Sequence, residues 1–465
     1  VADAFRHDFW GKPLSHPGSN THYRPLTVLT YRWDYSRSCY VPQKHVNKHD
    51  LSSPELEPLP PVLPDLVKQV LEDEDYPRLA REPLSSHDQG HVKVRKLGAR
   101  TISMYYSEDK FDENSKCLAS FRYTDLVLHA LVSVLVFAAA RRVAHLTVGP
   151  SAAAAALFAA HPVHIESVAT LYGRADVLCA AMQLLALLTA HAMSRASMAL
   201  GGSIAQSRRT VLLLVLALVL SAASVLAKEL GVVSSILVAL VYAHEASAVK
   251  GLSLSPLPAI FGDSLSVLVP LLRFAVLESW TPHYSWFDNP GEYLAPTHLS
   301  KLLTRGLNHA RYLLYLFFPL THSPSYSYNS FPIVLGLSDI RNVGTAVAYV
   351  ALLVVGVVAV VKREKTVLLL LCWACGTFLP SSNIMFPVST AFADRLLYVP
   401  SAPFCILCGW AMQHFIRFRP KKKTTASAVA AAVVALATLM TRERLVAWRS
   451  PKSLWKSVVK QLPEN

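Results

Sequence analysis

The chain alternates long apolar runs with short polar loops from about residue 121 to residue 441. About 20 apolar residues in a helix cross the hydrocarbon core of a bilayer, and slightly shorter runs cross it by local thinning of the bilayer. Ten runs meet this description, at about 121–140, 150–171, 177–194, 211–227, 230–246, 262–280, 346–361, 366–380, 396–416 and 425–441. The pattern predicts an all-α polytopic membrane protein with about ten spans.

The loops between these runs fall into two kinds. Basic loops lie at 141–142, 195–209, 250, 362–365 and 417–423. Loops with mixed polar residues lie at 173–176, 228–229, 287–290 and 394–395. Positive charge marks the cytoplasmic side of short loops, so the mixed loops are expected on the luminal or outer face. The segment 300–341 is apolar, but its flanking charges require it to return to that face, so we expect a re-entrant or interfacial segment.

Composition narrows the class of protein further. Hydrophobic residues make up 52% of the chain and charged residues only 16%, which fits a membrane protein rather than a soluble one. The net charge of +14 is concentrated in the basic loops, so topology explains it and no nucleic acid partner is expected. Membrane-complex partners stay open. The seven cysteines form no disulfide framework, and pairing of Cys39 with Cys117 is left undecided.

Two polar regions flank the spans. Residues 1–120 are predicted to be a luminal loop with an irregular insertion at about 41–115, which contains several prolines and an acidic run. Residues 442–465 are amphipathic and are predicted to be a luminal linker. The membrane domain would then occupy 121–441.

Four basic residues, three in the mixed loops and one in the luminal region 1–120, are predicted to bind a phosphate. They are Arg24, Arg174, Lys228 and Arg395. A guanidinium group binds phosphate through two parallel hydrogen bonds. Two alternatives remain open: a salt bridge between Arg174 and Asp176 that ties two helix ends, and an ion pair within Lys228–Glu229.

Further polar residues are expected to support this site. They are Asp176, Asp394, Tyr398, His161, His164, Glu166 and Glu229. His161 and His164 are three residues apart, but this spacing is a weak metal signal without a third ligand at a fixed offset. We therefore expect no metal and no resident cofactor. Whether the two histidines and Glu166 touch a substrate is left open.

Nine short motifs in this order resemble one family. They are DFWG at 8–11, YRPLTVLT at 23–30, HPVHIESV at 161–168, GRAD at 173–176, KE at 228–229, FDNP at 287–290, DIRN at 339–342, PSSN at 380–383 and RLLYVPS at 395–401. Together they resemble the transmembrane and tetratricopeptide-repeat (TMTC) protein O-mannosyltransferases. The resemblance covers nearly the whole chain except about 41–115.

The resemblance implies a C-type glycosyltransferase (GT-C) fold in the endoplasmic reticulum membrane. Such an enzyme is expected to transfer mannose from dolichyl-phosphate-mannose to Ser or Thr of luminal acceptor proteins, which are cadherin-like in animals. It also implies a tetratricopeptide-repeat (TPR) domain after this chain. The acidic pair of the family would lie upstream of Val1, so no catalytic base is assigned here.

The chain departs from the family pattern in two places. Asp394 stands where relatives generally have Glu, and the 41–115 insertion is long. A non-catalytic GT-C-like membrane subunit of a larger assembly is therefore the alternative hypothesis. A transporter is disfavoured, because the ionisable residues lie at span ends and no inverted repeat is visible.

Overall fold

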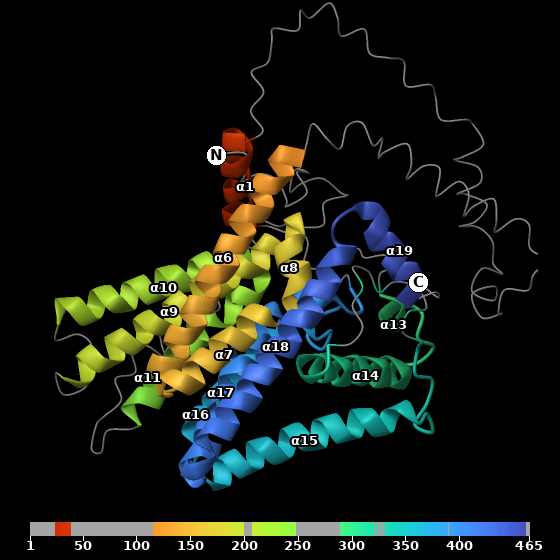
Figure 1. Cartoon of the computed structure of the whole chain (residues 1–465). Helices are drawn as coiled ribbons and strands as arrows, with labels where there is room; N and C mark the ends of the chain where they lie inside the picture. Colours follow the sequence, from red (N-terminus) through yellow and green to blue (C-terminus); the bar gives the residue numbers. More distant parts are fainter. Residues whose placement is uncertain are drawn as a thin grey trace, which may run out of the picture. The chain divides into compact units, whose positions relative to one another are not determined.

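The computed structural model describes residues 24–38, 115–199, 207–247, 289–319, 323, 326, 330, 332–388 and 390–461. These residues form helices and their connections, and no strand occurs among them, so the all-α prediction is confirmed. Contacts divide the chain into one unit of residues 1–33 with 121–465 and a second unit of residues 34–120. The long apolar helices lie almost entirely in the first unit (Figure 1).

Seven helical segments within the described residues are long and apolar enough to cross a membrane. The helices in these segments are α6 (Ser115–Arg142), α9 (Arg174–Met198), α10 (Arg208–Ala227), α11 (Ser234–Ala246), α15 (Arg341–Val361), α17 (Tyr398–Phe418) and α18 (Lys423–Ala447). Each corresponds to a predicted span, although α6 begins before residue 121. The predicted span at 262–280 lies outside the described residues.

Two predicted spans differ from a single long helix. The run at 150–171 is α7 (Val148–Ala160) followed by Pro162–Ala169, with a bend of 48° between them. Pro162 has no backbone N–H and cannot continue α7, so the helix ends and His161 caps the next turn by accepting a hydrogen bond from the Val163 backbone. The run at 366–380 is the shorter helix α16 (Lys365–Phe378).

A buried network of hydrogen bonds joins helices α9, α11 and α16. Helix α9 packs against α10 and α11, and α17 packs against α16 and α7 (Figure 1). The fully buried Trp373 of α16 donates from Nε1 to Gln183 of α9 at 2.9 Å, and Gln183 donates to Ser234 of α11 at 3.1 Å. Because each donor has an acceptor, this network joins three helices without an unsatisfied buried group.

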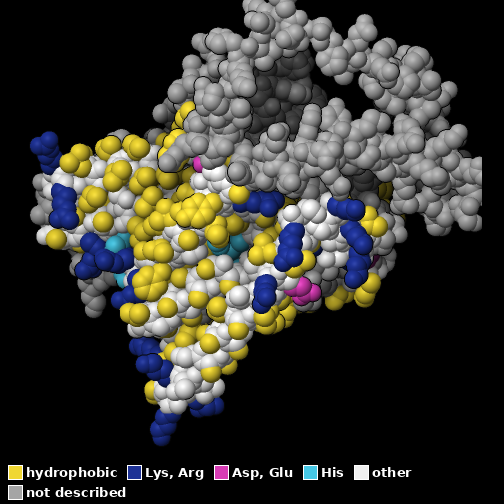
Figure 2. All heavy atoms as spheres, turned by 45° about the horizontal axis from the view of Figure 1, so that its top comes forward, with side chains coloured by type: hydrophobic (Ala, Val, Ile, Leu, Met, Phe, Trp, Pro, Cys, Tyr) yellow, Lys and Arg dark blue, Asp and Glu magenta, His cyan; other side chains and the backbone are white. Residues whose placement is uncertain are grey.

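The outward faces of the helices are apolar. Helix α15 exposes Val350, Leu353 and Val360, and hydrophobic side chains cover much of the surface in Figure 2. An exposed apolar surface of this extent is what lipid contact requires of a membrane-spanning bundle.

Shorter helices lie beside the spans. Helix α14 (His298–Phe317) packs against α15 and is not among the span candidates, which agrees with a segment that does not cross the membrane. Its re-entrant or interfacial position stays a prediction. Helix α1 (Pro25–Ser38) lies within the region predicted to be a loop, and α19 (Pro451–Gln461) follows α18.

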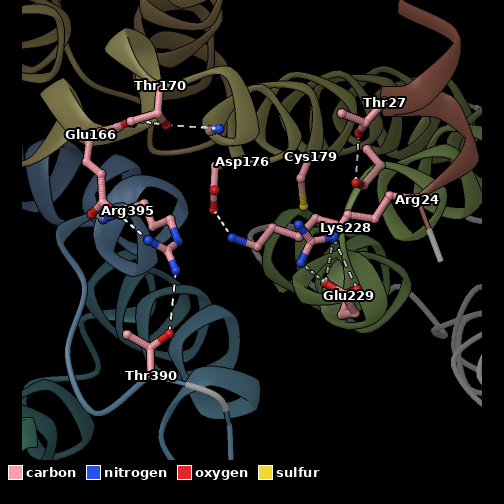
Figure 3. Close-up of polar contacts among 12 residues, drawn as sticks. Arg24, Thr27, Glu166, Thr170, Asp176, Cys179, Lys228, Glu229, Thr390 and Arg395 are labelled. Atoms are coloured by element: carbon pink, nitrogen blue, oxygen red, sulfur yellow. Dashed lines mark hydrogen bonds and ion pairs between the residues drawn. The ribbon is translucent and has the colours of Figure 1, made fainter. Parts of the chain in front are cut away.

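The helix ends gather into two groups, as the loop chemistry predicts. At the basic end, the backbone of Thr147 donates to Gln413, and Lys365 donates to the carbonyl of Ser247. The opposite end, called the motif end below, brings together the loops that contain Asp176, Lys228 and Arg395 (Figure 3).

Replacing Gly409 in α17 with alanine should destabilise the bundle. A Cβ at Gly409 would lie 2.7 Å from the carbonyl oxygen of Pro150, and overpacking of this kind costs about 1–3 kcal/mol. Thermal unfolding of the purified protein in detergent measures the effect. Gly376→Ala in α16 is the matched control, because a Cβ there meets no atom within 4 Å. Equal unfolding temperatures for the two variants would contradict the predicted tight packing.

Candidate functional site

Short 3-10 turns present the charged residues of the motif end. One turn at Leu171–Gly173 precedes α9, another at Glu229–Val233 precedes α11, and a third at Asp394–Leu397 precedes α17. The first turn requires glycine, because a Cβ at Gly173 would lie 2.3 Å from the backbone oxygen of Ser167. The charges therefore stand at the starts of three long helices.

Each predicted phosphate-binding cation forms an ion pair with a carboxylate. The pairs are Arg24–Glu229, Arg174–Asp125, Lys228–Asp176 and Arg395–Glu166. Neither ion pair considered from the sequence occurs: Arg174 does not pair with Asp176, nor Lys228 with Glu229. Both predicted pairs were wrong, because Arg174 and Lys228 each pair with a carboxylate from another helix: Arg174 with Asp125 of α6 and Lys228 with Asp176 of α9.

Arg174 is fully buried. Its guanidinium pairs with Asp125 of α6 and donates to the backbone oxygen of Phe121 at 3.0 Å. The rings of Tyr31 and Phe121 lie 4.6 and 5.4 Å from its guanidinium carbon, within the range of cation–π contact. With a side-chain exposure of 0%, Arg174 reaches no ligand unless the helices separate. These surroundings favour a structural role for Arg174, and its predicted phosphate contact stays a prediction.

Arg24 and Lys228 lie on the same side of Asp176 (Figure 3). Arg24 donates from Nε at 3.2 Å and from a terminal nitrogen at 2.9 Å to the carboxylate of Glu229. Burial opposes the charge of Arg24, but Glu229 outweighs burial and raises the pKa of Arg24. Burial lowers the pKa of Lys228, and the nearby guanidinium groups of Arg24 and Arg395 lower it further, whereas Asp176 opposes the change.

Arg395, which pairs with Glu166, is the most exposed of the four cations. The backbone N–H of Arg395 donates to Glu166 at 2.9 Å, and its guanidinium pairs with the same carboxylate. The guanidinium carbon also lies 5.1 Å from the centre of the Tyr172 ring. Side-chain exposure is 22% for Arg395, against 13% for Arg24 and 6% for Lys228.

The four pairs balance four positive charges with four negative charges. Figure 3 shows Arg395 on one side of Asp176 and Lys228 with Arg24 on the other. One oxygen of Asp176 is buried without a hydrogen-bond partner in the described part of the chain. An anionic ligand must therefore displace a carboxylate from one of these cations. Arg395 is the most exposed of them and so the easiest to reach.

The histidines of the motif end bond to protein oxygens. Nδ1 of His164 lies 2.7 Å from the carbonyl oxygen of Phe158, and Nε2 lies 2.7 Å from the hydroxyl of Ser401. His161 contacts the carbonyl oxygen of Leu316 at 3.0 Å. The hydroxyl of Tyr398 contacts His129 at 2.8 Å. Each of these side chains is therefore hydrogen-bonded within the protein.

Asp394 does not join Arg395 in binding a common partner. The hydroxyl of Tyr326 donates to Asp394 at 3.1 Å, whereas Arg395 turns to Glu166. The adjacent residues therefore make different contacts, and the predicted supporting role of Asp394 stays a prediction.

Asp125, the partner of Arg174, was not among the site residues predicted from the sequence. An ionisable residue inside an apolar run is costly unless it is paired, so its position in α6 was an available signal. A polar cavity beside α14 was also not predicted. There Arg305 pairs with Glu292, and a terminal guanidinium nitrogen of Arg305 donates to Oε2 of Glu292 at 2.6 Å. Asn289 of the FDNP motif contacts Asn383 of the PSSN motif there, at 3.1 Å.

The remaining motifs have structural roles or lie outside the described residues. Arg341 of the DIRN motif donates to the carbonyl oxygens of Pro332 and Ile333, and its hydrogen bonds lower the pKa of Asp339 to about 2. The DFWG motif, Tyr23, Phe287 and Asp288 are not among the described residues, so their predicted roles stay predictions.

Comparison with known proteins supports the family resemblance. Residues 278–353 match the family described as Protein O-mannosyl-transferase TMTC, DUF1736. Protein O-mannosyl-transferase TMTC3 of Mus musculus is 26% identical, over 99% of this chain and 43% of that protein. Human Protein O-mannosyl-transferase TMTC4 is 26% identical, over 100% of this chain and 57% of that protein. Human Protein O-mannosyl-transferase TMTC1 is 29% identical, over 74% of this chain and 42% of that protein.

The chain thus spans about half the length of the curated relatives it matches. No solved structure matches it. The resemblance recognised from the motifs is confirmed.

Removing either partner of the Arg174–Asp125 pair should destabilise the fold. Arg174→Ala leaves Asp125 as an uncompensated buried charge, which costs about 3–5 kcal/mol. Thermal unfolding in detergent measures the loss. The double variant with Asp125→Ala should lose less than the sum of the single variants, and the exposed Arg442→Ala is the control. Additive losses would show that the two residues are not coupled.

Proposed function

We propose that this chain, a relative of the TMTC protein O-mannosyl-transferases over nearly its whole length, is the membrane part of a protein O-mannosyltransferase. The donor would be dolichyl-phosphate-mannose, and the acceptors would be Ser or Thr residues of luminal proteins. The enzyme would have a GT-C fold in the endoplasmic reticulum membrane, with the motif end facing the lumen. The observation that carries the proposal is the convergence of Arg395, Lys228 and Arg24 at this end.

The donor phosphate would bind first to Arg395. A phosphodiester carries one negative charge, and Arg395 is the most exposed of the four paired cations. Lys228 and Arg24 lie close enough to Arg395 for their charges to interact, so they would add positive potential to the same place. Arg174 would hold α9 in place through Asp125 without touching the phosphate.

The same cations would favour the reaction itself. When the bond between the anomeric carbon and the phosphate oxygen breaks, the negative charge on the phosphate grows. Guanidinium groups already in place stabilise that developing charge more than the ground state, and this difference lowers the barrier. The acceptor hydroxyl would lose its proton to a carboxylate acting as general base.

An apolar groove is available for the polyprenyl chain of the donor. The groove has a volume of about 430 Å³ and lies between α7, α17 and α18. Its lining is almost entirely apolar and includes Leu157, Met412 and Val433. Helices α7 and α18 reach the motif end, where Thr441 donates to the carbonyl oxygen of Ala160. A lipid tail along these helices would leave its phosphate near Arg395.

Replacing Arg395 with alanine should reduce mannose transfer by roughly 10²-fold, the usual effect of losing one charge-stabilising donor. The assay uses membranes that contain the full-length gene product, labelled dolichyl-phosphate-mannose and a luminal acceptor protein. Arg395→Lys should recover only part of the activity, because lysine cannot form two parallel hydrogen bonds. The exposed Arg442→Ala is the control.

Two outcomes would contradict this assignment in different ways. Full activity of Arg395→Ala would remove the phosphate role of Arg395 but leave the enzyme assignment standing. If the folded wild-type protein transfers no mannose although donor and acceptor are supplied, the enzyme proposal fails. The non-catalytic membrane subunit would then be the better description.

Filling the groove should weaken binding of the donor. Ala430→Trp places a large ring among the lining residues, so the KM for dolichyl-phosphate-mannose should rise while transfer from a short-chain donor changes less. Ala428→Trp on the same helix is the matched control, because Ala428 is exposed and does not line the groove. An equal effect of both variants on both donors would argue against a lipid tail in the groove.

A further inference from the structure

Three histidines and a glutamate gather at the basic end, away from the ion pairs of the motif end. His145 lies in the connection between α6 and α7, and His191 lies in α9. His244 and Glu245 lie in the last turn of α11. No contact of the proposed transferase site involves these four residues, so the cluster needs its own explanation.

Two of the histidines contact one carboxylate oxygen of Glu245. Nε2 of His145 and Nδ1 of His191 each lie 3.0 Å from Oε1 of Glu245. One ligand atom from each of His145, His244 and Glu245 lies within 4.8 Å of the others. Around a tetrahedral zinc ion with bonds of about 2.0–2.2 Å, neighbouring ligand atoms lie about 3.3 Å apart. His191 is outside this group of three, so its ring would have to move toward the other ligand atoms to become a fourth ligand.

The burial of these groups also indicates a ligand. Glu245 has a side-chain exposure of 2%, and Nδ1 of His244 is buried without a hydrogen-bond partner among the described residues. An unpartnered buried nitrogen is costly, and coordination of a metal ion would remove that cost or rearrange the ring. His145 is half exposed, with an exposure of 51%, so an ion can enter from outside.

The backbone at His145 supports a specific role for this side chain. His145 has a φ of 54°, in the left-handed region that residues other than glycine seldom adopt. Such a conformation costs about 1–3 kcal/mol and is kept where the surroundings require it. Here the conformation directs the imidazole toward Glu245.

We propose that His145, His191, His244 and Glu245 bind one zinc ion that ties the α6–α7 connection to α9 and α11. Imidazole nitrogen suits zinc, whereas magnesium and calcium prefer sites built from oxygen. Four protein ligands leave no open position, which is typical of a structural site rather than a catalytic one. Glu245 supplies the negative charge that offsets the basic loops nearby.

The test uses the purified full chain with an affinity tag that contains no histidine. After treatment with a chelator, the protein is titrated with Co²⁺ and then with Zn²⁺. We expect one Co²⁺ per chain with the visible absorption of a tetrahedral site, and its displacement by Zn²⁺. His145→Ala and Glu245→Gln should each weaken zinc binding about tenfold or more. His298→Ala, which changes an exposed histidine of α14, should leave it unchanged.

Two results would overturn the zinc site. The first is that the folded, chelator-treated protein binds neither Co²⁺ nor Zn²⁺. The second is that the variants His145→Ala and Glu245→Gln bind zinc as tightly as the wild type. Either result would leave a hydrogen-bonded histidine–glutamate network only. Circular dichroism and the unfolding temperature verify folding. If Glu245→Gln fails to fold, His145→Ala still decides, because His145 is half exposed in a connection.

Discussion

The pairing of buried charges is the constraint on which the motif end depends. A charge in a low-dielectric interior is costly unless an opposite charge with good hydrogen bonding accompanies it. Four cations at the helix starts each meet this condition with a carboxylate from another part of the chain. The pairs therefore hold the helix starts together, and the fully buried Arg174 shows this role most clearly.

The same constraint determines what the site can bind. A balanced set of pairs attracts no anion strongly from a distance, but a phosphate close to Arg395 can replace Glu166 as its partner. Such an exchange would leave the buried carboxylate of Glu166 without its cation, so Glu166 would have to take up a proton or another partner. Binding would thus be coupled to a change at Glu166 and Tyr172, both of which contact Arg395. This coupling explains how one group of residues can serve both stability and the proposed recognition.

The two ends of the bundle solve the problem of buried polar groups differently. At the motif end, guanidinium and ammonium groups neutralise carboxylates directly. At the basic end, histidines surround Glu245, and imidazole can either share protons with a carboxylate or coordinate a metal ion. A metal there would stabilise the ends of α9 and α11 without adding contacts at the proposed transferase site.

The sequence by itself determined the class of protein, most of the spans, the separation of basic and motif-bearing ends and the family resemblance. These properties depend on composition and on residues close together in the chain, such as the run of apolar residues in α9. Only the tertiary structure decided which charges pair. Arg174 and Asp125 are 49 positions apart and Arg395 and Glu166 are 229 apart, so nothing local in the sequence relates them. The packing of helices brings these residues together, because each buried charge needs the partner that the neighbouring helix presents.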